Sequence, residues 1–508
     1  MSGEATWGTA LTKAGCYDFL VPVADKSLAQ ACKRSPEGAA LLSAAARADL
    51  QDICLRRLGI VYERSLVRLA ARRVRPSTTF LLNAGGRAKA QALANIAQEL
   101  SDEVAKDGGA SLRASLPYAH AYEQAIAVNL GDALAEFLSR LASRCESVSA
   151  ELLEGRPITR VEGLSASDAD PHRHGRMVMR VETDAGCFYY KPHDCTLDAC
   201  YLALVGSWFA DCAQAARLVQ GEGYAFAERH VPKELACADE LPTYWHNLGC
   251  LTALFHGLGS RDMTCDNLMC CGTRPAALDL ETLLVGEMPF TESAVAGSPV
   301  LPDLSPQALA NSVACTAVLP LGVGGVRYSP LTTDNASGTC LPHLGGDARS
   351  VTGFERDFSA GFERGYRRLM CNREEILAVL GRHETASCRQ VLLNTRAYVE
   401  ARMLLFDPSA LSDGSKRDEV LARLNKAYAA FSPELRKRVA QADARALTEG
   451  DIPYFCSKAC SRMLYDADGN ALGELLAQSA LEVARGRLMR LSEDELRFEL
   501  DLIQRCLA

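Results

Sequence analysis

The feature that most constrains the fold is a change of hydrophobic periodicity near residue 155. From about residue 28 to 155, apolar residues recur at three- and four-residue spacing with Arg, Lys and Glu on the opposite face, which predicts amphipathic helices. The following segment, 157–193, contains two short alternating runs, RMVMRVET and CFYYKP, separated by the turn-like Asp184-Ala185-Gly186. This pattern predicts a β-hairpin. We therefore expect an α+β protein.

Four regions are expected along the chain. Its 508 residues exceed the size of a single hydrophobic core, so at least two packed units are required. The regions are a helical N-terminal region (1–155), a core containing the hairpin (156–285), a loop-rich section with many Gly, Pro, Ser and Thr residues that is expected to order around a substrate (286–357), and a helical C-terminal region (358–508).

Shorter segments carry local predictions. Helices are expected at 198–218 and 242–256, short buried strands at 268–271 and 276–279, a loop at GGASLRASLPY (108–118), and a helix break at GDIPYF (450–455).

Composition excludes several classes of protein. Hydrophobic residues make up 48% of the chain and charged residues 23%, which is an ordinary globular balance. The formal charge of -8, without any block of Lys or Arg, argues against a nucleic-acid partner. The N-terminus lacks a basic segment followed by an apolar one, and no apolar run approaches the roughly 20 residues of a membrane span. A cytoplasmic protein without a transmembrane segment is expected.

The twenty cysteines are expected to stay reduced in such a compartment. The densest group is Cys265, Cys270 and Cys271. A zinc site there lacks a fourth ligand and paired loop spacing, so small buried hydrophobic side chains are the favoured interpretation.

Four polar residues suggest phosphoryl transfer. Lys191 ends the second strand of the hairpin, Asp262 is followed five residues later by Asn267, and Asp279 ends a short strand. Protein kinases space a catalytic Asp and a metal-binding Asn in this way, with a second metal-binding Asp downstream. The γ-phosphoryl group needs magnesium, which takes hard oxygen ligands, and the substrate hydroxyl needs a carboxylate to accept its proton.

The spacing D-x-x-x-x-N alone is weak in a chain with 63 acidic residues, where a helix N-cap followed by an Asn turn gives the same letters. The order of hairpin lysine, helix, Asp-Asn loop and strand with Asp favours the functional interpretation. Glu281 is interpreted as a surface charge, with a second metal ligand as the alternative.

Several motifs together resemble one family. The segment DPHRHGRMVMRVETDAGCFYYKPH is similar to a run in the N-terminal dehydratase domain of the LanM (class II) lanthipeptide synthetases. GLGSRDMTCDNLM with AALDLETLL, CRQVLLNTRAY, GDIPYF and the closing LSEDELRFELDLIQRCL follow in the family's order. The resemblance spans roughly residues 30–508. It implies a core resembling lipid and protein kinases, with a small hairpin-containing lobe and large helical segments at both ends.

The resemblance also implies roles for individual residues. Lys191 matches the phosphate-holding lysine, Asp262 the catalytic base, and Asn267 and Asp279 the magnesium ligands. The residues matching the nucleotide-contacting run are Asp170, His172 and Arg176, and those matching the phosphate-elimination pair are Arg389 and Thr395. Tyr398 also falls at a matching position, but a buried core tyrosine is the favoured interpretation.

Three positions depart from the family pattern. Thr264 replaces a histidine two residues after the catalytic Asp, Leu393 replaces a second arginine before Thr395, and Met177 replaces a serine. The chain also ends where the family's cyclase domain begins, so ring closure is expected to need a separate cyclase or to be spontaneous.

The sequence therefore predicts a stand-alone dehydratase. ATP and Mg²⁺ would phosphorylate Ser or Thr of a leader-bearing precursor peptide, and elimination would give dehydroalanine or dehydrobutyrine. Two alternatives stay open: a peptide or small-molecule kinase that stops at the phosphate, which Leu393 favours, and a catalytically inactive scaffold, which Thr264 leaves possible.

Overall fold

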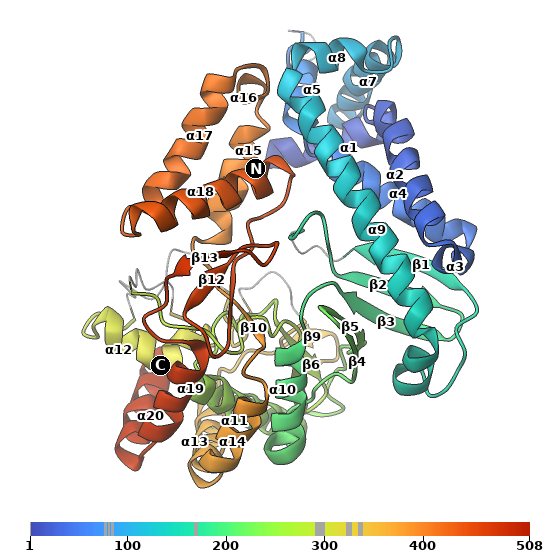
Figure 1. The fold of residues 1–508 in the computed structure, drawn as a ribbon. Coiled ribbons are helices and arrows are strands. Elements are labelled where there is room, and N and C mark those ends of the chain that lie inside the picture. Colours follow the sequence, from blue (N-terminus) through green and yellow to red (C-terminus); the bar gives the residue numbers. More distant parts are fainter. Residues whose placement is uncertain are drawn as a thin grey trace. The chain divides into compact units, whose positions relative to one another are not determined.

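The computed structural model divides into two compact units, each built from two stretches of sequence (Figure 1). Unit 1 comprises residues 1–192 and 391–454, and unit 2 comprises residues 193–390 and 455–508. The structure describes residues 2–75, 79, 82, 86–166, 171–289, 300–321, 328–333 and 339–508. The two units are defined by contacts in space, whereas the four predicted regions are defined by composition along the sequence. The two divisions therefore describe different properties of the chain.

Unit 1 is mainly helical. Its first stretch contains α1 (Ser2–Lys13), η1 (Asp18–Leu20), α2 (Val21–Arg34), α3 (Pro36–Ala40), α4 (Ala44–Gly59), α5 (Glu63–Ala71), α7 (Gly86–Ala105), α8 (Ala110–Ser115), α9 (Pro117–Leu152), β1 (Val161–Ala166), β2 (Met179–Thr183) and β3 (Gly186–Lys191). Its second stretch contains α15 (Thr395–Leu405), α16 (Pro408–Ser412), α17 (Gly414–Ala427) and α18 (Pro433–Thr448).

The long helix α9 organises this unit and packs against α2, α3 and α4 (Figure 1). Its apolar face is buried, and so is one charged side chain, Glu123. That carboxylate accepts hydrogen bonds from Arg113 Nε at 2.9 Å and Tyr62 Oη at 2.6 Å. A buried charge is tolerated when paired in this way, and removing either partner would be costly.

The predicted hairpin is confirmed as β2 and β3, which pair antiparallel with Met179 opposite Tyr190. β1 pairs with the other edge of β2. The turn is closed by Thr183, whose hydroxyl donates to the Gly186 carbonyl at 2.8 Å. Gly186 has a φ of 146°, which a side chain would rarely adopt, so glycine is required there.

Unit 2 mixes helices with short antiparallel strands. Its first stretch contains α10 (Thr196–Leu204), the π-helical turn η2 (Val205–Phe209), β4 (Leu218–Gly221), β5 (Tyr224–Glu228), η3 (Ala238–Glu240), α11 (Leu241–Leu258), β6 (Leu268–Cys271), β7 (Arg274–Ala277), α12 (Pro306–Asn311), η4 (Val313–Thr316), β8 (His343–Leu344), β9 (Asp347–Ala348), α13 (Glu355–Cys371), α14 (Arg373–Arg382) and β10 (Ser387–Arg389). Its second stretch contains β11 (Cys456–Lys458), β12 (Met463–Tyr465), β13 (Ala471–Glu474), α19 (Ala480–Arg490) and α20 (Glu493–Leu507).

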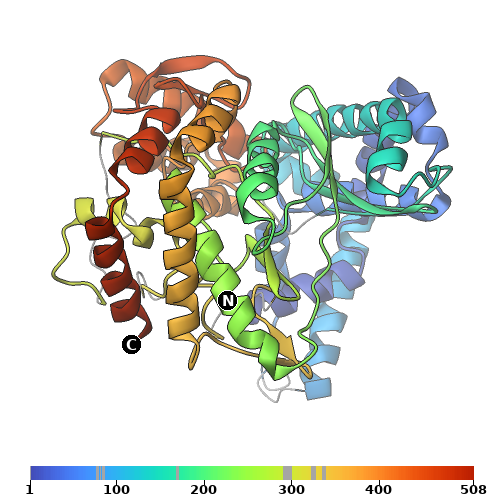
Figure 2. The same cartoon turned by 90° about the horizontal axis from the view of Figure 1, so that it is seen from below.

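Helices α11 and α13 form the centre of unit 2 and lie side by side (Figure 2). Glycines allow their backbones to approach closely. A Cβ atom on Gly361 would lie 1.8 Å from the His246 carbonyl oxygen, and one on Gly249 would lie 2.0 Å from the Phe358 carbonyl oxygen. These distances exclude any side chain unless the helices separate.

The mixed α/β class is confirmed, and the strand predicted at 268–271 is found as β6. The strand predicted at 276–279 is found two residues earlier, as β7, so Asp279 follows this strand and does not end it. The helix predicted at 198–218 is wrong beyond residue 209, because the Gln214 amide donates instead to the Pro275 carbonyl. The hairpin β4–β5 follows. The loop predicted at 108–118 is also wrong: α8 occupies its centre, and Pro117 starts α9, a position that tolerates the missing amide proton.

The sheet β10–β11–β12–β13 was not predicted, because its strands have only three or four residues and show no clear alternation. Cys265 and Cys270 lie in the hydrophobic core of unit 2 and Cys271 is also buried, as the small-hydrophobe interpretation expects. Among the described residues, no helix combines the length and the apolar character that a bilayer span requires.

Candidate functional site

The loop that carries Asp262 follows α11 in unit 2. Gly259 ends the helix with a φ of 74°, and the loop is then fixed on both sides of Asp262 by backbone bonds. The Arg261 amide donates to the Thr282 carbonyl at 3.1 Å, and the Met263 amide donates to the Thr316 carbonyl at 2.9 Å. Asp262 itself has a φ of 61°, which is rare for a residue other than glycine. Strain of this kind persists only where the surroundings fix it, and it is common in active sites.

Asn267 and Asp279 are placed around this loop by the β6–β7 hairpin. The side-chain amide of Asn267 donates to the Asp262 carbonyl at 2.7 Å and to Asp262 Oδ2 at 3.4 Å. The Asn267 carbonyl in turn accepts from the Leu278 amide at 2.9 Å. Asp279 follows at once, with Oδ1 accepting from the Glu281 amide at 3.1 Å. The structure thus brings together three of the predicted residues.

The electrostatics of Asp262 depend on the same neighbours. Its side chain is accessible to solvent, but the dense protein around it limits hydration and raises the pKa of the carboxyl group to about 6. The negative charge of Asp279 raises this pKa further, whereas the Arg389 guanidinium and the Asn267 hydrogen bond lower it. A carboxylate with this pKa can accept a proton near neutral pH.

Arg389 belongs to the same group, although it lies far away in sequence. Its backbone amide donates to the Glu281 carbonyl at 2.9 Å, and its Nη1 lies 3.6 Å from Glu281 Oε1. The interpretation of Glu281 as a surface charge is wrong, since its side chain is only 11% exposed. The position of Glu281, two residues after Asp279, does not indicate its pairing with Arg389. Arg389 belongs to β10, which lies far from Glu281 in the sequence.

Thr395 lies in unit 1, at the first position of α15, and is exposed. The preceding Asn394 caps this helix by accepting from the Arg396 amide at 2.8 Å. Arg389 and Thr395 therefore belong to different units, and their predicted pairing stays a prediction. Tyr398 is buried, with its hydroxyl 2.7 Å from that of Tyr428, so its interpretation as a core tyrosine is confirmed.

His172 and Arg176 lie on a tight turn of unit 1. Their backbones exchange two hydrogen bonds, and Arg173 and His174 between them have φ values of 53° and 65°. Nδ1 of His172 lies 2.8 Å from the Ile452 carbonyl. The turn is thereby joined to the GDIPYF segment.

Three further predicted nucleotide-contacting residues belong to this part of the sequence: Arg176 in the turn, Lys191 after it and Asp170 before it. The Arg176 guanidinium donates to Glu136 Oε2 on α9 at 3.0 Å and 2.6 Å, so this arginine is already held by a carboxylate. Lys191 is the last residue of β3. Asp170 lies outside the described residues.

Asp451 anchors the turn and was not singled out from the sequence. Its Oδ2 accepts from the Gly175 amide at 2.8 Å, and its Oδ1 pairs with Arg57 at 3.0 Å. Asp451→Ala should leave the Gly175 amide and the Arg57 charge without this partner, at a cost of about 3 kcal/mol or more. We expect faster hydrogen exchange of residues 172–176, measured by mass spectrometry, while exchange in unit 2 stays unchanged. Unaltered protection of the turn would contradict its anchoring role.

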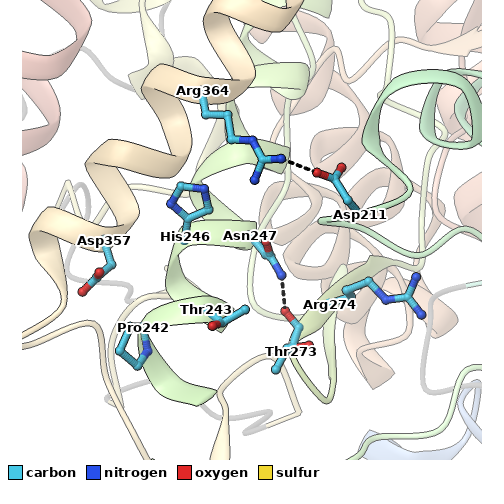
Figure 3. Close-up of a pocket in the computed structure, with 9 residues that line it drawn as sticks. All are labelled: Asp211, Pro242, Thr243, His246, Asn247, Thr273, Arg274, Asp357 and Arg364. Atoms are coloured by element: carbon cyan, nitrogen blue, oxygen red, sulfur yellow. Dashed lines mark hydrogen bonds and ion pairs between the residues drawn. The ribbon is translucent and has the colours of Figure 1, made fainter. Parts of the chain in front are cut away.

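A polar pocket of about 770 Å³ lies elsewhere in unit 2, around the first turns of α11 and the β6–β7 turn (Figure 3). In it, Arg364 pairs with Asp211 at 2.6 Å and Asn247 donates to the Thr273 carbonyl at 2.8 Å. None of the predicted site residues lines it. Since α11 has 18 residues, its two ends lie about 27 Å apart, and the Asp262 loop follows the opposite end. The convergent acidic and basic groups make the Asp262 loop the candidate site.

Comparisons with known proteins agree with the motif analysis. A family model described as "Domain of unknown function (DUF4135)" matches residues 122–335 and 325–458, more than half of the chain. The "Lacticin 481/lactococcin biosynthesis protein LcnDR2" of Lactococcus lactis subsp. lactis is 20% identical over 347 residues, covering 59% of this chain and 36% of that protein. The chain thus spans little more than a third of the length of this relative. The chain belongs to the DUF4135 family, and its predicted likeness to the dehydratase region of the LanM-type lanthipeptide synthetases is confirmed.

Proposed function

We propose that the chain is a lanthipeptide biosynthesis enzyme that uses ATP to phosphorylate Ser or Thr of a precursor peptide and then eliminates the phosphate. The similarity to a lacticin 481/lactococcin biosynthesis protein supports the pathway class and the peptide substrate. The observation that carries the chemistry is the gathering of Asp262, Asn267, Asp279 and Arg389 in unit 2.

The acidic part of this group fits Mg²⁺. The charge of Asp279 raises the pKa of Asp262, so the two carboxylates repel each other and a cation between them would relieve the repulsion. Asn267 uses its side-chain nitrogen toward Asp262, which leaves its amide oxygen as the atom suited to a hard cation. Asn267 and Asp279 would hold the ion, which would neutralise charge on the phosphates of ATP.

Asp262 is suited to accept the proton of the substrate hydroxyl. Its pKa of about 6 lies between that of an ordinary carboxyl and neutral pH, so at pH 7 it is mostly ionised and still basic enough to take a proton. The fixed loop holds the carboxylate in one place, which reduces the entropy cost of orienting the two groups. Lys191, His172 and Arg176 of unit 1 are proposed to contact the nucleotide.

Elimination needs positive charge where phosphate departs. The planar guanidinium of Arg389 can donate two parallel hydrogen bonds to a phosphate. Glu281 Oε1 lies 3.6 Å from Nη1 of Arg389, so this carboxylate orients the guanidinium. Thr395 is proposed to assist this step. A separate cyclase would act on the dehydrated product.

The kinase that stops at the phosphate is the second candidate function. Leu393, in place of a second arginine, is the observation that favours it, because one cation stabilises a leaving phosphate less than two.

The two functions are separated by Arg389→Ala with the cognate precursor peptide, ATP and Mg²⁺. Arg389 is proposed to contact the phosphate only in elimination, so phosphorylation should continue, slowed by the higher pKa of Asp262 that follows loss of the guanidinium, while phosphopeptide accumulates. Mass spectrometry distinguishes a gain of about 80 Da for each trapped phosphate from a loss of about 18 Da for each dehydration, given the phosphoryl chemistry. Arg396→Ala is the matched control, since Arg396 is exposed and pairs with Glu400 in the same helix. If the wild-type enzyme itself stops at the phosphopeptide, the kinase function replaces the dehydratase function.

A further inference from the structure

One histidine and two glutamates form a buried group outside the Asp262 loop. His256 lies on α11, and Glu495 and Glu499 lie one turn apart on α20. Their ligand atoms all lie within 4.8 Å of one another. His256 and Glu499 are each only 1% exposed. The group thus has the residue types and the spacing of a metal site.

The imidazole of His256 lacks the partners that a buried polar ring needs. Both of its ring nitrogens are buried, and among the described residues neither has a partner at ordinary hydrogen-bond geometry, although the Ser312 backbone interacts weakly with the ring. Nε2 lies 3.9 Å from Glu499 Oε1, too far for a hydrogen bond. Two ligand atoms that share one ion at 2.0–2.2 Å lie roughly 3–4 Å apart. The gap therefore matches a bridging ion better than a direct contact.

Neighbouring groups orient both carboxylates. The Val313 amide of η4 donates to Glu499 Oε2 at 2.8 Å, and the Tyr366 hydroxyl of α13 donates to Glu495 Oε2 at 3.0 Å. Each bond occupies one carboxylate oxygen and leaves the other for a cation. Hydrogen bonds of this kind behind the ligands are typical of metal sites in proteins.

Two guanidinium groups lie close to the three residues. Arg487 donates to the His256 carbonyl at 3.2 Å and to the Ala310 carbonyl at 2.7 Å, so a guanidinium lies close to the group. Arg490 adds a second positive charge nearby. A cation bound here would rely on the carboxylates of Glu495 and Glu499 to offset these two positive charges.

We propose that His256, Glu495 and Glu499 bind one divalent transition-metal ion of the zinc type. One imidazole nitrogen with two carboxylate oxygens suits Zn²⁺, whereas Mg²⁺ and Ca²⁺ prefer oxygen ligands alone. The fourth position is left to water or a backbone carbonyl.

Such an ion would support the candidate site without entering its chemistry. It would join the last turn of α11 to α20, and Glu499 already bonds η4 through Val313. Helix α11 leads directly into the Asp262 loop, and the η4 residue Thr316 accepts from the Met263 amide in that loop. The ion would therefore fix α11 and η4, the two segments that hold the Asp262 loop in place.

Elemental analysis of the full chain, purified without chelator, tests this proposal. We expect about one zinc per chain, a lower Tm after removal of the ion with a chelator, and recovery of Tm with Zn²⁺ but not with Mg²⁺. His256→Gln and Glu499→Gln should lose the ion. In Glu499→Gln the side-chain amide oxygen can still accept from Val313, so the variant keeps that bond. His120→Gln is the control, because His120 is an exposed histidine of unit 1.

The proposal is overturned if the wild-type protein carries no stoichiometric metal and its Tm does not respond to Zn²⁺. It is overturned equally if both variants retain the metal. Should the variants fail to fold, the metal content of the wild-type protein and its chelator titration still decide.

Discussion

Asp262→Asn and Asp279→Ala should each lower peptide-dependent ATP consumption by about a thousandfold or more, which corresponds to roughly 4 kcal/mol of barrier stabilisation. Asp262→Asn removes the proton acceptor but keeps an oxygen near Asn267, and Asp279→Ala removes a carboxylate proposed to hold Mg²⁺. The measurement is ADP release with saturating precursor peptide.

The control for this experiment is Asp266→Asn. Asp266 is an exposed carboxylate of the same loop, and its charge is the smallest of the influences on the pKa of Asp262, so this substitution removes one negative charge while the proposed base and ligands stay in place. ADP release near the wild-type rate is expected. Turnover within about tenfold of wild type in both Asp262→Asn and Asp279→Ala would refute the kinase chemistry, since a lost base or metal ligand costs more than that.

Gly361→Ala is expected to have the largest effect on stability. The new Cβ would lie 1.8 Å from the His246 carbonyl oxygen, and backbone atoms cannot move aside as a flexible side chain can. Helices α11 and α13 would have to separate, at a cost of about 3 kcal/mol or more. Thermal unfolding should shift downward, and hydrogen exchange should accelerate in both helices.

Gly381→Ala is the matched control, because Gly381 is also helical but a Cβ there meets nothing within 4 Å. Alanine has the higher helix propensity, so this variant should be unchanged or more stable by up to about 1 kcal/mol. Equal destabilisation by both substitutions would show that helix propensity, and not the α11–α13 contact, determines the outcome.

The parts of the fold that could be predicted are those with a local signal. The β2–β3 hairpin follows from alternation around a turn, and β6 and β7 follow from short apolar runs. The segment after residue 209 was assigned to a helix because its apolar spacing is ambiguous. The backbone of Gln214 pairs with the segment of Pro275 and Ala276, and this pairing ends the helical conformation. No local sequence pattern indicates such a contact.

The candidate site shows the same limit. Asp262, Asn267 and Asp279 could be proposed together because a motif of fixed spacing contains them. The proximity of Arg389 to Glu281 depends on β10, a strand of three residues paired with β11 near the end of the chain. Anchoring of the His172 turn by Asp451 likewise joins residues far apart in sequence. Contacts of this kind arise from tertiary structure, which propensity and periodicity do not encode.

The interleaving of the two units has a consequence for synthesis on the ribosome. The chain passes from one unit to the other at residues 192/193, 390/391 and 454/455. The first 192 residues, which belong to unit 1, are therefore synthesised well before helices α15–α18, which complete that unit. Apolar surface of unit 1 stays uncovered while most of unit 2 is synthesised. Neither unit can be expressed as one contiguous fragment. A cut at any of these three crossings separates the two stretches of at least one unit, so isolating one unit requires a linker in place of the stretch that belongs to the other.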